Sequence, residues 1–363
     1  MKLEGCNVWQ HAAGDDDRNY VDLCLKWGVI LNGPGHLGRW PDCSRLLHDE
    51  GWSAKKLSDL RRFSQDMQDG DIVVLRLGTK VVAAVGVLIG GYEWCDAFGD
   101  VDGWVLQHVR RVRWYWVGPQ TFETYALKLG DTTQLLGEGA VRAWLDSLQP
   151  NCPVDAVLPA LPYLAGGQEI DYSRISEFLF DHGVASASIT RLMDEIGELT
   201  RIARWYGRAQ GKKPSEHETV AYLVVPLLRA LGWTPQRMAI EWNYLDVGLF
   251  DSLPRSDETL QAVVEAKKMD NACLSAKAQA AGYAEKRPAC RRVIVTDGIR
   301  YGVYVKTEGG AFDLYAYLNL SRLRDEYPIY PCHGAEEALL AMSPDWRPGV
   351  GMKVLAQTPK DNL

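Results

Sequence analysis

The sequence has no pair of cysteines at the spacing of a metal site. Its eight cysteines are scattered singly and no CxxC pair occurs, which predicts reduced thiols and gives zinc little support. It has no apolar signal region near its N-terminus and no run of about 18 apolar residues, which secreted and membrane-spanning proteins need. It also lacks a GxxxxGKS or GxxxxGKT phosphate-binding loop, so it encodes no ATP-driven motor. We therefore expect a cytoplasmic protein without a membrane partner.

The chain also has no excess of positive charge. It contains 40 lysines and arginines against 47 aspartates and glutamates, which gives a net charge of −7. That balance argues against indiscriminate coating of nucleic acid but leaves local basic patches open. Its 363 residues are enough for two domains with a connector. Tryptophan is common, with 13 residues, most of them in the first third of the chain.

Two acids lie in separate apolar, strand-like runs. Asp246 interrupts the run 244–250, and Glu265 and Lys267 share a face of the strand expected over 261–268, because alternate residues of a strand point to the same side. If the two strands pair, Asp246 can lie beside Glu265. Two carboxylates held together repel each other unless a cation joins them, and a hard ion such as Mg²⁺ favours carboxylate oxygens. The adjacent lysine can then orient water or stabilise charge on a phosphate.

Two predicted helices carry further candidate residues. Gln279 and Tyr283 are four residues apart on one helix, so they share a face. Ser215 and Glu218 have the spacing of a capping box at the start of another helix. Glu216, in its first turn, either faces the site or is a carboxylate favoured by the helix dipole.

These pieces, in this order, resemble the PD-(D/E)xK nuclease superfamily, in the form found in the N-terminal nuclease region of type I restriction enzyme R subunits. The matching residues are Asp246, Glu265, Ala266, Lys267, Gln279 and Tyr283. The resemblance extends to the helix that bears Glu216 and ends in PLLRALGW, and it implies that Glu216 is an accessory acid for the metal or the lysine. Leu245 stands before the first acid, where the superfamily usually has proline.

The resemblance implies a metal-dependent DNA endonuclease. Asp246 and Glu265 would hold Mg²⁺, for which Mn²⁺ can substitute, and Lys267 would position the attacking water and stabilise charge on the phosphoryl group. Gln279 and Tyr283 would orient the attacking group or the DNA backbone. Because one such site cuts one strand, a double-strand break would need a homodimer on DNA or two binding events.

The first third of the sequence predicts a β-rich domain. The runs 71–77 and 80–90 are separated by Gly78-Thr79, a hairpin signal, and 108–117 predicts a further strand. With an early tryptophan and the GVILNGPG turn (28–35), this order resembles the PUA-like superfold, particularly EVE and YTH-type domains. It is also similar to the recognition domains fused to modification-dependent restriction enzymes. The resemblance implies a β-barrel that binds nucleic acid and holds an extruded base in an aromatic pocket.

Aromatic faces can replace the stacking that an extruded base loses, which is worth a few kcal/mol. The candidate walls of such a pocket are Trp9, Trp27, Trp40, Tyr92, Trp94 and Trp104. The candidate contacts to the DNA backbone are Arg110, Arg111 and Arg113. Core packing is the alternative for each ring, and a solvated surface is the alternative for the arginines. Arg110 is the weakest candidate, because it shares a strand face with Trp114 and Trp116.

The whole sequence predicts an α/β (α+β) protein in four parts. These are a PUA-like β-barrel domain over 1–118, a helical and Pro-rich connector over 119–185, a nuclease domain with a mixed sheet flanked by helices over 186–340, and a tail over 341–363. With the resemblances, it predicts a modification-dependent restriction enzyme that flips a modified base of double-stranded DNA and hydrolyses phosphodiester bonds, in defence against phage. The alternative is a non-catalytic protein that binds modified nucleic acid and uses a nuclease fold as its scaffold.

Overall fold

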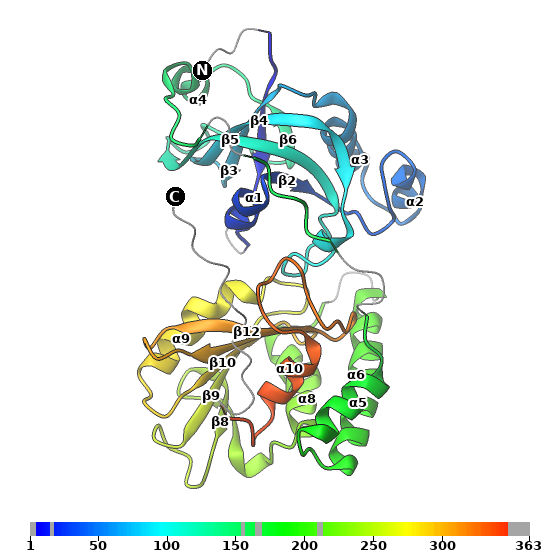
Figure 1. Ribbon diagram of the computed structural model, residues 1–363, viewed down its shortest axis with the longest axis vertical. Coiled ribbons are helices and arrows are strands. Elements are labelled where there is room, and N and C mark those ends of the chain that lie inside the picture. The colour runs from blue at the N-terminus through cyan, green and yellow to red at the C-terminus, as the bar shows by residue number, and fades with distance from the viewer. Residues whose placement is uncertain (1–4, 15–17, 154–156, 164–168, 209–212, 348–363) are drawn as a thin grey trace. The chain divides into compact units, whose positions relative to one another are not determined.

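The chain forms two compact units, and it passes from the first to the second between Leu164 and Ala165 (Figure 1). The computed structural model describes residues 5–14, 18–153, 157–163, 169–208 and 213–347. The stretch predicted as a connector, 119–185, is divided between the units. Its first part adds a strand and a helix to the first unit, and its last part contributes a helix to the second.

The first unit is built on a mixed six-stranded sheet with the order β2-β5-β4-β3-β1-β6, which curls into a half-barrel (Figure 1). Its strands are β1 (Val8–Ala12), β2 (Val29–Asn32), β3 (Ile72–Leu77), β4 (Val81–Trp94), β5 (His108–Thr121) and β6 (Thr133–Leu135). Its helices are α1 (Val21–Trp27), α2 (Cys43–Asp49), α3 (Ala54–Arg61), η1 (Arg62–Asp66), η2 (Asp96–Phe98) and α4 (Ala140–Ser147). Three register shifts interrupt the pairing of the long strands β4 and β5. Such bulges increase twist, and they account for the curl of this sheet.

The hairpin predicted at Gly78-Thr79 is confirmed, because β3 and β4 pair antiparallel on either side of it and Gly78 has φ of 56°. The strand β1 pairs parallel with β3 and antiparallel with β6. The stretch beyond residue 118 therefore completes the first sheet, since β6 adds its edge strand.

The second unit contains a mixed sheet with the order β12-β11-β10-β9-β8-β7, in which β9 and β10 form the parallel pair. Its strands are β7 (Met238–Trp242), β8 (Leu245–Phe250), β9 (Leu260–Ala266), β10 (Arg292–Thr296), β11 (Arg300–Lys306) and β12 (Phe312–Asn319). Its helices are α5 (Tyr172–Asp181), α6 (Ser186–Arg208), α7 (Glu216–Thr219), η3 (Val220–Val224), α8 (Val225–Ala230), η4 (Pro235–Arg237), η5 (Leu274–Ala276), α9 (Lys277–Glu285) and α10 (Ala335–Met342).

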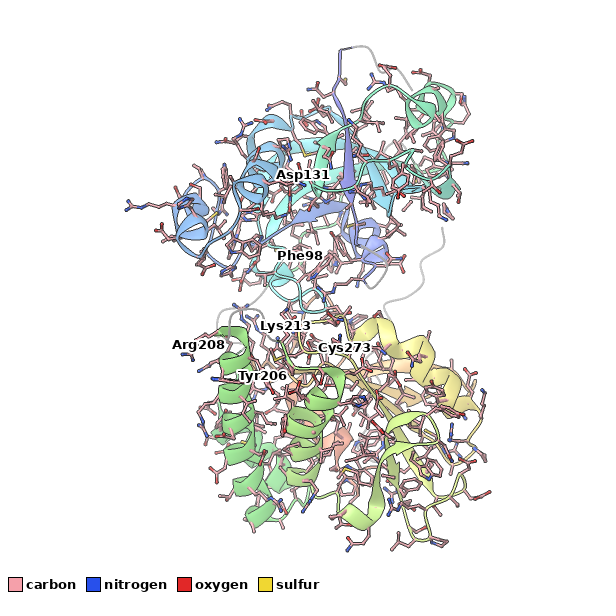
Figure 2. The ribbon with its side chains drawn as sticks, turned by 180° about the vertical axis from the view of Figure 1, so that it is seen from behind. Phe98, Asp131, Tyr206, Arg208, Lys213 and Cys273 are labelled. Atoms are coloured by element: carbon pink, nitrogen blue, oxygen red, sulfur yellow. The ribbon has the colours of Figure 1, made fainter. Side chains whose placement is uncertain are left out.

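Helices cover both faces of this second sheet. Ala280 and Ala284 of α9 pack against Val263 and Val295 on one face. The helices α6, α8 and α10 pack with Val264 on the other face, where the larger apolar core lies. Figure 2 shows Tyr206 and Arg208 at the C-terminal end of α6. Because both faces are buried, the central strands consist almost wholly of apolar residues, and each polar residue in them stands out.

The helix predicted from Ser215 forms as expected, with Glu218 completing the capping box. Pro226 lies within this helical stretch, where proline lacks the backbone donor and clashes with the preceding turn. The structure resolves the clash with a π-helical segment, η3, which directly precedes α8 and its proline.

The first residues of the stretch expected to be a tail, 341–363, belong to the second unit. The helix α10 continues to Met342, and Trp346 is buried in the core of the second unit. The remainder of that stretch, 348–363, lies outside the described residues. Among the helices that the structure describes, none is both long and apolar enough to cross a membrane.

The turn between β10 and β11 is organised by Asp297, whose side chain is fully buried. One carboxylate oxygen accepts from the backbone N–H of Ile299 at 3.0 Å and of Arg300 at 2.7 Å. The other accepts from the Arg300 guanidinium at 2.8 Å and from the backbone N–H of Asp270 at 3.2 Å. This carboxylate therefore connects the β10–β11 turn to the loop that follows β9.

We predict that Asp297→Ala lowers the free energy of unfolding of the second unit by on the order of 3 kcal/mol, because it leaves buried donors without an acceptor. Hydrogen-exchange mass spectrometry on peptides from β9 to β11 would measure the loss. Asp313→Ala, at an exposed position of β12, is the matched control and should leave exchange unchanged. Equal protection in the two variants would contradict this role of Asp297.

Candidate functional site

The strands β8 and β9 place two carboxylates side by side, as the sequence predicted. Val247 pairs with Val264 in the antiparallel register, so Asp246 and Glu265 occupy the next positions on the two strands. Asp246 accepts a hydrogen bond from the backbone N–H of Ala266 at 2.6 Å, which holds its carboxylate against β9. Glu265 is 3% exposed. The pair of acids thus lies partly inside the apolar centre of the second sheet.

Lys267 faces the same side of β9 as Glu265. Its Nζ lies 3.0 Å from Glu265 Oε1 and donates to Gln279 Oε1, on α9, at 3.2 Å. Its backbone N–H donates to the carbonyl of Thr296 at 2.7 Å, which continues the pairing of β9 with β10. The structure therefore brings together four predicted site residues: Asp246, Glu265, Lys267 and Gln279.

Glu216 lies at the start of α7 and lines a small cavity of about 190 Å³ together with Asp246. Its charge acts on both Glu265 and Lys267. Glu216 is half-buried in the first turn of α7, a position that fits both an accessory acid and a carboxylate favoured by the helix dipole.

His217 and Glu241 line the same cavity and were not predicted from the sequence. The His217 Nδ1 lies 2.9 Å from Glu241 Oε1, and both side chains are exposed. Glu241 has φ of 52°, a left-handed conformation that non-glycine residues rarely adopt. The position of His217 beside Glu216 was the one signal in the sequence that could have indicated this ion pair.

Tyr283 packs outside the group formed by Asp246, Glu265, Lys267 and Gln279. Its half-buried ring packs with the apolar cluster on the α9 face of the sheet, and its carbonyl accepts from Arg287 at 2.8 Å. Among the described residues no hydrogen bond joins its hydroxyl to Lys267 or Gln279. The helical spacing to Gln279 was correct, but the side chain packs into the layer between α9 and the sheet.

The acids suit a hard divalent cation. Asp246, Glu265 and Glu216 bring three carboxylates into electrostatic contact, and Lys267 supplies one positive charge among them. Within the described residues no three His, Cys, Asp or Glu side chains converge on one metal position. Mg²⁺ is usually held by one or two carboxylates with several waters, so Asp246 and Glu265 are the residues that could hold it.

Burial and neighbouring charges shift the pKa values of two side chains in the site. Burial raises the pKa of the Glu265 carboxyl above its ordinary value of 4.5, and the charges of Asp246 and Glu216 add to the rise, although Lys267 opposes it. Burial lowers the pKa of the Lys267 ammonium, but the hydrogen bond and charge of Glu265, with the other two acids, outweigh it and leave that pKa raised. Burial and the neighbouring acids thus make ionisation of Glu265 less favourable than in a free side chain, and Lys267 offsets only part of this effect.

The first unit contains a cavity of about 360 Å³, within the size range of ligand pockets. Its lining residues are Tyr20, Asn32, Gly33, Pro34, His36, Trp52, Lys56, Gly103, Trp104, Val105, Leu106 and Thr132. Most of this lining is apolar, and it includes the side chains of Tyr20, Trp52 and Trp104. The GVILNGPG turn singled out in the sequence contributes Asn32, Gly33 and Pro34, and Trp104 is the one predicted aromatic residue that lines the cavity.

The other predicted pocket aromatics have other contacts. Trp9 is 3% exposed and its indole N–H donates to Asp71 at 2.8 Å, because β1 lies inside the sheet between β3 and β6. The Trp94 indole N–H donates to the carbonyl of Gly35 at 3.0 Å, and the Tyr92 hydroxyl lies 2.7 Å from His108 Nδ1. Trp40 packs against the small cluster around α2 and α3, and Lys26 lies 5.1 Å from the Trp27 ring centroid.

Two of the three arginines predicted to contact the DNA backbone have other contacts in the structure. Arg110 is 3% exposed and its guanidinium donates to the carbonyl of Gly90 at 3.4 Å, so it cannot reach DNA. The Arg111 guanidinium donates to the carbonyl of Pro159. Arg113, whose side chain is exposed, is the remaining candidate of the three.

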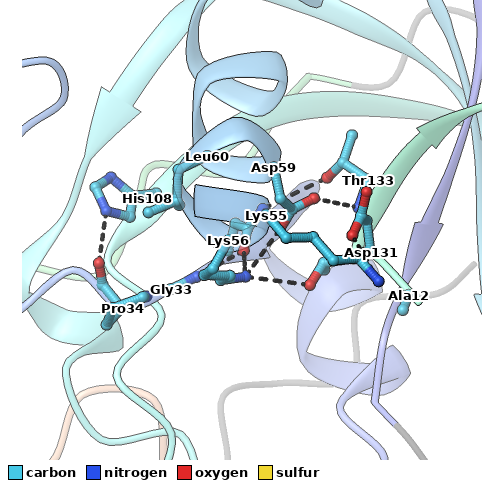
Figure 3. A network of polar contacts seen from close by, with 12 residues as sticks. Ala12, Gly33, Pro34, Lys55, Lys56, Asp59, Leu60, His108, Asp131 and Thr133 are labelled. Carbon is cyan, nitrogen blue, oxygen red and sulfur yellow. Dashed lines mark hydrogen bonds and ion pairs between the residues drawn. The ribbon is translucent and has the colours of Figure 1, made fainter. Parts of the chain in front are cut away.

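A buried polar network lies beside the cavity (Figure 3). Lys56 Nζ donates to Asn32 Oδ1 and to Asp59 Oδ2, each at 2.8 Å, and to Thr132 Oγ1 at 3.3 Å. Asp59 also accepts from the backbone N–H of Thr133 at 2.8 Å. Burial raises the pKa of Asp59, but the charge of Lys56 and these hydrogen bonds outweigh burial and hold that pKa below its ordinary value. Asp59 is therefore ionised and neutralises Lys56.

The raised pKa of Glu265 predicts a dependence of stability on pH in the metal-free protein. The folded protein holds the Glu265 proton more tightly than the unfolded chain does, so the free energy of unfolding falls as pH rises from 4.5 through the raised pKa. Glu265→Gln should remove that fall, and Glu308→Gln, at an exposed position, should not. Urea denaturation in EDTA over a pH series would measure both. An identical slope in wild type and Glu265→Gln would contradict the prediction.

Comparison with known proteins finds similarity in the first unit. A family model described as "Domain of unknown function (DUF8426)" matches residues 16–135. No curated protein and no solved structure matches the chain. The matched range includes every residue that lines the cavity of the first unit and stops before the second unit begins. The similarity to this family thus covers the part of the chain that carries the cavity.

Proposed function

We propose that this protein is a Mg²⁺-dependent DNA endonuclease of the PD-(D/E)xK type, whose second unit hydrolyses phosphodiester bonds. The observation that carries the proposal is the placement of Asp246 beside the buried Glu265, with Lys267 Nζ 3.0 Å from Glu265. These residues come from two adjoining strands, and Gln279 of the following helix contacts the lysine. The order of strand, strand and helix is that of the PD-(D/E)xK resemblance.

The chemistry follows from what each side chain can do. Asp246 and Glu265 would hold Mg²⁺, or Mn²⁺ in its place, and the bound ion would supply an acidified water and a polarised phosphoryl oxygen. Lys267 stabilises the negative charge that develops on the phosphate and helps to orient the attacking water. Gln279 fixes the direction of the Lys267 ammonium through the hydrogen bond that it accepts. Glu216 adds a third negative charge, which strengthens the attraction for a cation.

The first unit, in this proposal, is a PUA-like domain that selects the DNA by a modified base. A flipped base would enter the cavity and stack on Trp104, Tyr20 or Trp52. The curled sheet and the mainly apolar lining support this reading, since a planar ring needs flat apolar walls. Because one site cuts one strand, a double-strand break requires a homodimer on DNA or two binding events. A modification-dependent cut of this kind suits the restriction of foreign DNA, such as that of a phage, in the cytoplasm.

Lys267→Ala should reduce the rate of DNA cleavage by about 10²–10³-fold, the loss that follows removal of a donor that stabilises transition-state charge. Conversion of supercoiled plasmid to nicked and linear forms with Mg²⁺ would measure the rate. The matched control is Lys268→Ala, one residue further along and exposed, which should cleave at the wild-type rate. Cleavage by Lys267→Ala at the wild-type rate would overturn the assignment of the site.

Trp104→Ala should weaken binding of DNA that carries the recognised base by about 1–3 kcal/mol, the usual contribution of one stacked base. Fluorescence anisotropy in EDTA would measure the affinity without cleavage. Trp205→Ala, at a 62% exposed position of α6 in the second unit, is the control and should bind as wild type does. If Trp104→Ala retained wild-type affinity, the base would have to bind elsewhere.

A further inference from the structure

The polar wall of the cavity in the first unit is asymmetric in charge. Lys56 lines the cavity and its side chain is 24% exposed, whereas its partner Asp59 is 1% exposed. A molecule in the cavity therefore meets the ammonium, with the carboxylate shielded from it. Such a wall presents hydrogen-bond donors.

Asn32 offers the cavity no free hydrogen-bonding group. Its amide oxygen accepts from Lys56 Nζ at 2.8 Å and from the backbone N–H of Gly33 at 2.9 Å. Its amide nitrogen donates to Asp59 Oδ2 at 3.2 Å. The amide thus serves to hold Lys56 and Asp59 in place, and it fixes the direction of the ammonium.

One of the three contacts of the Lys56 ammonium can be exchanged. The contacts to Asn32 and Asp59 are 2.8 Å long, while the contact to Thr132, another residue of the cavity lining, is 3.3 Å long. An acceptor on a bound molecule can take the place of Thr132 without breaking the two short contacts. An amino group at that position would instead face the ammonium with a donor against a donor.

We propose that Lys56 determines the specificity of this cavity, which takes a planar ring that places an oxygen acceptor against the Lys56 ammonium and rejects one that places an amino group there. The oxygen can be the keto oxygen of the ring itself or a carboxylate substituent on it. Hydrogen bonds to a charged donor are stronger than neutral ones, and a site built to make one discriminates against a ligand that cannot. The inference rests on the base-binding role of the first unit and is independent of cleavage.

The test is binding of the full-length protein, in EDTA, to single-stranded oligonucleotides that each carry one modified base, so that no base pair has to open. The bases are 5-hydroxymethylcytosine, 5-hydroxymethyluracil and 5-carboxylcytosine. The second has a keto oxygen and a ring N–H where the first has an amino group and an unprotonated ring nitrogen. The third differs from the first by a carboxylate in place of the hydroxymethyl group. We expect the uracil or the carboxylate oligonucleotide to bind at least about tenfold more tightly than the first. The preferred one identifies the source of the oxygen.

Two lysine variants distinguish a specific effect of Lys56 from the general effect of removing one positive charge. Lys56→Met should lose the preference, whereas Lys55→Met should keep it, because Lys55 is absent from the cavity lining and its ammonium lies 3.4 Å from Asp131. The double variant Lys56→Met with Asp59→Asn covers the case in which an unpaired buried Asp59 prevents folding, and thermal unfolding would confirm that it folds.

Equal binding of the three oligonucleotides by wild type would overturn the inference, as would a preference that survives both in Lys56→Met and in the double variant. Cleavage of DNA with Mg²⁺ but no discrimination between bases would reject the inference and leave the nuclease site standing. Discrimination in EDTA without cleavage under any condition would support the inference and reject the nuclease.

Discussion

The second unit depends on the pairing of β8 with β9, which holds Asp246 beside Glu265 against the repulsion of their charges. A slip of one residue in this register would turn Glu265 to the opposite face of the sheet. The apolar residues on both faces of these strands prevent such a slip, since it would exchange the buried sets. Two acids fixed in this way, with Glu216 nearby and Lys267 as a cationic partner, form the arrangement on which the proposed divalent-ion site rests.

In the first unit the buried acid is paired with an ammonium, whereas in the second unit two acids lie side by side. A carboxylate, Asp59, is held behind an ammonium, Lys56, and hydrogen bonds from Asn32 and the Thr133 backbone satisfy the carboxylate. The pair is neutral as a whole, yet the cavity meets its positive side. The two units therefore carry different charged sites: neighbouring acids with a lysine in the second, and a lysine paired with a shielded carboxylate in the first. The proposed selection of a base and hydrolysis of a phosphodiester would use these two arrangements.

Candidate site residues could be predicted from the sequence where local strand or helix spacing determines which side chains share a face. Asp246, Glu265 and Lys267 could be placed together from strand alternation and one assumed pairing, and the capping box located Glu216. Tyr283 shows the limit, because helical spacing relates it to Gln279 but does not say which side chain packs inward. The set of aromatic residues that lines the cavity of the first unit could not be predicted from local spacing. Trp52 and Trp104 come from distant parts of the chain, and Trp9 is buried because β6, more than 100 residues later, pairs with its strand. The burial of Arg110 follows from the same long-range sheet.

The central claim is that this chain cuts DNA at a divalent-ion site and chooses that DNA by a modified base. The most direct measurement is incubation of the purified protein with Mg²⁺ and phage DNA that contains modified cytosines or adenines, alongside the same DNA without modification. The account predicts cleavage of modified DNA, none of unmodified DNA, and none of either in EDTA. Tight binding of modified DNA without cleavage of any DNA would contradict it, and would favour a binding protein that uses a nuclease fold as a scaffold.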